Sequence, residues 1–122
     1  MSGFIDIVCN LYTPVEVRKG QTGIDDHFKK QVRMTPEMRR GISIPNYLKM
    51  MDAAGIEHSL LIAVRCGDMN VKGSFNISYQ RVASICKKYP DRFSGLAGVD
   101  PTLGMQQLRD LEFAVNELGF VG

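Results

Sequence analysis

Three polar side chains follow the ends of apolar runs, where a parallel α/β fold binds its ligands. Asn10 and Tyr12 come after the run at residues 4–9, and Arg65 comes after the run at residues 59–64. Asn10 and Tyr12 could exchange hydrogen bonds with a substrate, and the planar fork of Arg65 could pair with a carboxylate. We expect all three to lie at one substrate-binding rim. The alternatives are that Asn10 caps its strand, Tyr12 packs, and Arg65 forms an internal ion pair.

The other polar candidates are less informative. Asp100 before Pro101 follows a third apolar run, but this pair is typical of the start of a turn or helix. His58 precedes its strand, at the wrong end for catalysis, and neither it nor His27 has a partner at metal-ligand spacing. The three cysteines form no CxxC pair, so we assign no metal ligand and no catalytic residue. We interpret four charged loop residues as solvated surface rather than an acid–base cluster: Glu16, Asp25, Asp26 and His27.

The hydrophobic pattern predicts the elements that would position these residues. Continuous apolar runs indicate parallel strands at residues 4–9, 59–64 and 93–99, the first of them buried on both faces. Apolar residues at helical spacing indicate helices near residues 44–54, 78–88 and 104–118. The last helix has this predicted core stripe: Leu108, Leu111, Val115 and Leu118. Residues 10–41 form a long loop with one short turn near residues 36–40.

Strands that alternate with helices predict parallel βαβ units with right-handed crossovers. We interpret the fold as α/β, the N-terminal part of a (β/α)₈ TIM barrel. A complete barrel needs roughly 250 residues, so residues 1–122 are expected to be a partial barrel domain, truncated at the start of strand four. An open flavodoxin-like sheet is the alternative, and it would place the first strand between two others.

Composition excludes several classes of function. The net charge of +2 is too small to favour nucleic acid as a partner. No stretch contains the roughly 18 uninterrupted apolar residues of a membrane span, and the N-terminal residues lack the pattern of a signal peptide. We therefore expect a cytoplasmic protein with a small-molecule substrate and no membrane or nucleic-acid partner.

Four segments resemble one known family. They are FIDIVCNLYTP at residues 4–14, MMDAAGIEHSLLIAV at 50–64, KKYPDRFSGLAGVDP at 87–101 and LRDLEFAVNELGFVG at 108–122. The chain resembles the amidohydrolase-related family, in the branch of aminocarboxymuconate-semialdehyde decarboxylase and related aromatic-acid decarboxylases. The third segment is the most specific. The resemblance implies a metal-dependent (β/α)₈ barrel that hydrolyses C–N or related bonds, or that removes CO₂ from aromatic or unsaturated acids.

The resemblance also implies an HxH pair of metal ligands just after the first-strand aspartate. Counted from Asp6, those positions hold Val8 and Asn10. Valine cannot bind a metal, and neutral asparagine is a poor zinc ligand. We therefore assign no cofactor to this chain, although zinc or another divalent metal is implied for the parent family.

These observations support two interpretations of function. The first is a fragment of an amidohydrolase-like hydrolase or decarboxylase that acts on a small carboxylated substrate, with the isolated chain inactive. The second is a metal-free degenerate barrel or half-barrel binding module without catalytic activity. In either case the open strand edges of a partial barrel favour self-association.

Overall fold

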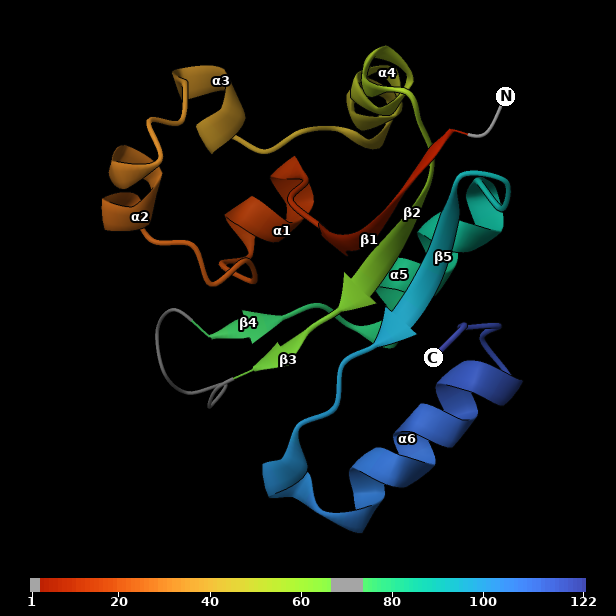
Figure 1. The fold of residues 1–122 in the computed structure, drawn as a ribbon. Coiled ribbons are helices and arrows are strands. Elements are labelled where there is room, and N and C mark those ends of the chain that lie inside the picture. The colour runs from red at the N-terminus through yellow and green to blue at the C-terminus, as the bar shows by residue number, and fades with distance from the viewer. Residues whose placement is uncertain (1–2, 67–73) are drawn as a thin grey trace.

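The computed structural model describes residues 3–66 and 74–122. Three parallel strands form the central sheet: β1 (Phe4–Asn10), β2 (Ile56–Ala63) and β5 (Phe93–Ala97). Their order is β1-β2-β5 (Figure 1). Within the described sheet β1 pairs with β2 alone, which contradicts the flavodoxin-like alternative and agrees with the consecutive strand order of a barrel.

Three longer helices follow the strands, namely α4 (Ile44–Ala54), α5 (Tyr79–Lys88) and α6 (Met105–Asn116). Local sequence explains where α4 and α5 begin. The hydroxyls of Ser43 and Ser78 accept hydrogen bonds from backbone N–H groups in the first turn of α4 and α5. Gly55, at φ 71°, ends α4 in the left-handed conformation. The predicted α/β alternation is therefore confirmed.

The predicted burial of the first strand on both faces is wrong. Four of its side chains are 62–73% exposed: Phe4, Ile5, Ile7 and Val8. Only Cys9 in β1 is buried, on the side where α4 packs. The reason is that β1 lies at the edge of the described sheet, where it pairs with β2 alone.

The predicted core stripe of α6 is also incorrect in part. Leu108 is 47% exposed and Val115 is 40% exposed, whereas Gln107 and Ala114 are buried. Gln107 turns inward because its side chain bonds the backbone N–H of Asp100. The hydrogen bond between Gln107 and Asp100 therefore helps to fix the rotation of α6 about its axis.

The long segment between β1 and α4 contains more structure than the sequence predicts. Three short helices lie in it: α1 (Pro14–Arg18), α2 (Asp26–Gln31) and α3 (Pro36–Arg39). Only α3 corresponds to the predicted turn. Helices of this length have no period to detect, although each begins with a side-chain cap from Thr13, Asp25 or Thr35.

The loop after β2 forms a small antiparallel ribbon, β3 (Arg65–Cys66) with β4 (Phe75–Asn76). Residues 67–73 of the predicted polar loop, including Gly67 and Asp68, lie outside the described residues. A 3₁₀ turn, η1 (Pro101–Leu103), follows β5. In the described part of the chain, no helix combines the length and the apolar character that a membrane span requires.

Residues 120–122 lie along the free edge of β5. Val121 donates its N–H to the carbonyl of Gly95 over 3.0 Å, and Ala97 donates to the carbonyl of Gly122 over 2.8 Å. Phe120 is 4% exposed and packs where Gly95 has no side chain. These contacts place residues 120–122 beside β5, but the described sheet has three strands, so the start of a fourth strand stays a prediction.

Candidate functional site at the carboxyl ends of the strands

Asn10 and Tyr12 line one small hollow at the carboxyl end of β1. Its volume is about 130 Å³, and apolar side chains such as Leu61 also line it. Asn10 is exposed and stands opposite Ile62 in the sheet register. Tyr12 donates its hydroxyl to the carbonyl of Arg39 over 3.3 Å, so the short helix α3 helps to hold it.

Two hydrogen-bonded side chains, those of buried Cys9 and half-buried Tyr47, also line this hollow. The Cys9 thiol and the Tyr47 hydroxyl are 2.9 Å apart, and Tyr47 also donates to Asp6 Oδ2 over 3.5 Å. Burial raises the pKa of the Cys9 thiol, and burial together with Cys9 raises the pKa of Tyr47. Both groups therefore remain protonated at neutral pH, and neither is suited to act as a nucleophile or a base.

Arg65 follows β2 and lines a second hollow, of about 210 Å³. Its Nη1 donates to Asp110 Oδ2 over 3.0 Å. Its guanidinium carbon lies 4.4 Å from the centroid of the Tyr79 ring, which is cation–π distance. The internal ion pair given as the alternative role of Arg65 is therefore present.

Two carboxylates accompany Arg65. Hydrogen bonds from Thr102 lower the pKa of Asp100, which lines the same hollow. Hydrogen bonds from Gln106 and Arg65 lower the pKa of Asp110. Both acids are therefore negative at neutral pH. Asp100 lines the hollow together with Arg65, whereas Asp110 contacts Arg65 from α6. Nearby negative charges weaken the attraction of Arg65 for an anion. Anion binding therefore depends on whether the guanidinium N–H groups point at the anion.

The structure thus brings Asn10 and Tyr12 together but places Arg65 at a different hollow. Whether the three contact one substrate stays a prediction. Sequence reasoning missed Tyr79 and Asp110, which belong to helices α5 and α6. No local signal marks them, because their contact with Arg65 depends on how two helices pack beside the strand ends.

The histidines and the loop acids take other positions. His58 contacts the Asp91 carbonyl at 3.1 Å and the Ser94 hydroxyl at 2.8 Å, near the amino end of β5. His27 is exposed on α2. The interpretation of Glu16 as a solvated loop residue is wrong: it is 1% exposed and accepts a 2.6 Å hydrogen bond from Arg81 Nε. The ion pair with Arg81 compensates its burial.

The described residues do not fit a metal centre. Among them, no group of three or more His, Cys, Asp and Glu side chains is arranged to hold a metal ion. Val8 offers no donor atom and is 62% exposed, and Asn10 offers only a neutral amide. The positions that correspond to the family's HxH pair therefore supply no strong ligand.

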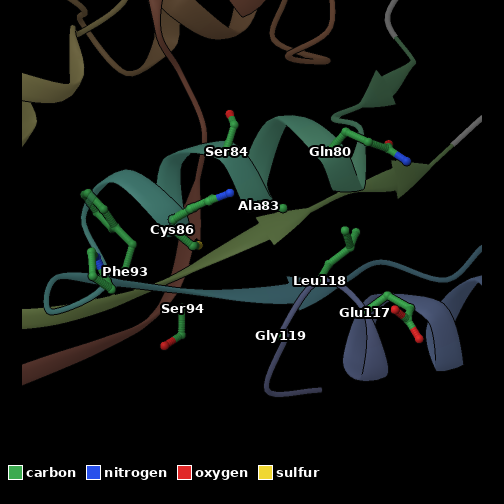
Figure 2. A pocket seen from close by; sticks show the side chains of 11 residues that line it. Gln80, Ala83, Ser84, Cys86, Phe93, Ser94, Glu117, Leu118 and Gly119 are labelled. Carbon is green, nitrogen blue, oxygen red and sulfur yellow. The ribbon is translucent and has the colours of Figure 1, made fainter.

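A wider groove lies away from the carboxyl ends of the strands, between α5 and residues 117–119, which follow α6 (Figure 2). Its volume is about 670 Å³, and Phe93 and Ser94 at the amino end of β5 also line it. Burial raises the pKa of the Cys86 thiol there to about 11, so this thiol is neutral at physiological pH. We do not place the site here, because parallel α/β folds bind ligands at the opposite end of the strands.

Comparisons with known proteins identify the parent fold. No protein-family model and no curated protein matches the chain. Among solved structures, 2,6-dihydroxybenzoate decarboxylase from Rhizobium is 26% identical with a TM-score of 0.61, over 100% of this chain and 38% of that one. Dihydroxybenzoic acid decarboxylase from a Polaromonas species, with bound manganese and the inhibitor 2-nitroresorcinol, is 26% identical with a TM-score of 0.59, over 100% and 37%.

A third structure shares the fold at lower identity. It is 5-carboxyvanillate decarboxylase from Novosphingobium aromaticivorans with bound manganese, 21% identical with a TM-score of 0.59, over 95% of this chain and 39% of that one. The chain thus spans less than two fifths of each of these structures. The neighbours are decarboxylases of the amidohydrolase superfamily, so the resemblance seen in the sequence is confirmed. The parallel sheet matches the N-terminal part of a TIM barrel.

Proposed function

We propose that this chain forms part of an amidohydrolase-like barrel enzyme that decarboxylates a small carboxylated, aromatic substrate. The observation that carries the proposal is the alignment of the whole chain with 2,6-dihydroxybenzoate decarboxylase, at a TM-score of 0.61 and 26% identity. Hydrolysis of a carboxylated substrate is the less favoured reaction, because the three neighbours described above are decarboxylases. Our expectation of a cytoplasmic location is part of the same proposal.

In this proposal three residues that follow the ends of the strands contact the substrate. Arg65 pairs with the substrate carboxylate, for which its planar fork is suited. Asn10 and Tyr12 exchange hydrogen bonds with the substrate at the end of β1. A divalent metal, when bound in such an enzyme, would polarise the substrate. Val8 and Asn10 do not fit that metal, so we assign it no ligand in this chain.

The competing proposal is a metal-free degenerate barrel or half-barrel binding module. The absence of donor atoms on Val8 favours it. CO₂ release from 2,6-dihydroxybenzoate by the whole protein, measured with added manganese and with a chelator, separates the two proposals. Turnover supports the enzyme, binding without turnover supports the binding module, and neither binding nor turnover contradicts both for this class of ligand.

Substitution of Arg65 tests the role of the rim. Loss of one charge-assisted hydrogen bond costs about 1.5–3 kcal/mol, so we expect Arg65→Ala to raise KM, or Kd if there is no turnover, by roughly 10-fold to 150-fold. The matched control is Arg92→Ala. Arg92 also pairs with an aspartate, Asp52, but it lies just before β5 at the amino end of the sheet. Equal effects of the two substitutions would contradict a substrate contact by Arg65.

A further inference from the structure

We propose that Asp110 is a positioning residue that holds the Arg65 guanidinium at the hollow that Arg65 and Asp100 line. The inference rests on the proposed role of Arg65 in binding a substrate carboxylate. Its structural basis is a set of contacts that hold Arg65 from two helices, with Asp110 on α6 and Tyr79 on α5.

Two hydrogen bonds besides the one from Arg65 hold the Asp110 carboxylate in place. Its Oδ1 accepts a hydrogen bond from Gln106 Nε2 over 3.0 Å. Its Oδ2 accepts from Gln107 Nε2 over 2.8 Å and from Arg65 Nη1 over 3.0 Å. Both carboxylate oxygens are thus used, and three donors from two elements converge on one acidic side chain.

Gln107 ties this carboxylate to the loop after β5. The side chain is 1% exposed, and its Oε1 accepts the backbone N–H of Asp100 over 3.1 Å. A buried amide with both ends bonded is held in one orientation, because any other leaves a buried polar atom without a partner. The position of Asp110 is therefore coupled to the backbone of the carboxyl rim.

A second contact, with the aromatic ring of Tyr79, also constrains Arg65. Tyr79 is 2% exposed and donates its hydroxyl to the Gly98 carbonyl over 2.6 Å. Its ring lies 4.4 Å from the guanidinium carbon. An arginine side chain loses conformational entropy when it is ordered. A guanidinium that is already held in place therefore loses less entropy when it binds an anion.

Asp110 could affect a bound carboxylate in two opposite ways. As a negative charge beside Arg65, it weakens the attraction of the guanidinium for an anion. As a positioning group, it strengthens binding by holding the fork in place. Asp110→Asn removes the charge at nearly constant shape, but leaves one acceptor oxygen for three donors. Neutralisation alone therefore predicts tighter binding of the carboxylate, and positioning predicts weaker binding.

The experiment measures the Kd of 2,6-dihydroxybenzoate by calorimetry in the whole protein. We expect Asp110→Asn to raise Kd about 5-fold to 10-fold, which corresponds to loss of about one hydrogen bond. We expect Asp110→Glu, which keeps the charge but displaces it by one methylene, to raise Kd as well. In the active enzyme, KM should rise more than kcat falls. The control Asp52→Asn removes the other Arg–Asp ion pair at the amino end of the sheet and should leave Kd within about twofold.

An unchanged or lower Kd in Asp110→Asn, with a raised Kd in Arg65→Ala, would overturn the positioning role and leave the proposed role of Arg65 intact. Unchanged Kd in Arg65→Ala would overturn both. If Asp110→Asn fails to fold, Asp110→Glu decides alone, because a role through charge only predicts wild-type Kd for that variant.

Discussion

The ion pair between buried Glu16 and the partly exposed Arg81 gives the sharpest prediction about stability. It joins α1 to α5 across 65 positions of sequence, with Arg81 Nε 2.6 Å from Glu16 Oε1. The Thr13 hydroxyl donates to the other carboxylate oxygen. Because Glu16 is 1% exposed, removal of Arg81 would leave a buried carboxylate with its main partner gone.

Breaking a buried pair from one side costs about 3–5 kcal/mol. Because the Arg81 side chain is 34% exposed, water can reach Glu16 in the variant, and we expect Arg81→Ala to lower the free energy of unfolding by about 2–3 kcal/mol. The measurement is urea unfolding of the whole protein followed by circular dichroism. Asp52→Ala is the matched control, because the Asp52 side chain is 64% exposed in its pair with Arg92. An exposed pair is worth about 0–1 kcal/mol. A cost for Arg81→Ala no larger than that of the control would refute the reasoning.

The same pair predicts a dependence of stability on pH. Burial alone would raise the pKa of Glu16, but hydrogen bonds from Arg81 and Thr13 outweigh burial and lower it. A carboxyl whose pKa is lower in the folded state stabilises fully above its unfolded pKa, about 4.3 for glutamate. This stabilisation is lost as pH falls through the folded pKa. Glu16→Gln should remove that part of the acid destabilisation, and an unchanged pH profile in this variant would contradict the assignment.

Two further predictions concern packing and metal binding. Gly95→Ala should destabilise by about 1–3 kcal/mol in urea unfolding, because the added Cβ would lie 2.6 Å from the Phe120 ring; an unchanged midpoint would show that residues 120–122 do not pack against β5 in solution. The 122-residue chain should not bind zinc tightly, since its described residues hold no suitable cluster; one equivalent bound tightly at neutral pH in calorimetry would contradict this.

The sequence predicts the regular elements well because their signals are local. The serine caps at Ser43 and Ser78 mark two helix starts, and Gly55 marks a helix end. Each of these side chains acts on backbone a few residues away, so neighbouring positions contain enough information. The short helices α1 and α2 were missed although Thr13 and Asp25 cap them, because a cap without a following apolar period is weak support for a helix.

The site was less predictable because its contacts are long-range. Asn10, Tyr12 and Arg65 are candidates chosen by a general rule about strand ends, and their contact with substrate stays a prediction. The partner of Arg65 is Asp110, 45 positions later, and nothing in either local sequence predicts the pairing. It depends on the rotation of α6, which a buried Gln107 sets against the leucine and valine pattern of that helix.

The strand β1 is apolar in sequence but largely exposed in the structure. Four apolar side chains there are 62–73% exposed, and full burial of each would contribute about 1.5–3 kcal/mol. The outer edge of β1 also offers backbone groups that can pair with another strand. We therefore expect the 122-residue chain on its own to self-associate through β1 in analytical ultracentrifugation. Ile7→Lys should shift it toward monomer, because a charge on an edge strand opposes pairing, whereas Met105→Lys, at a 67% exposed position on α6, should not. A sharp monomer boundary with cooperative unfolding of the unmodified chain would show that it is a self-sufficient domain and would refute this prediction.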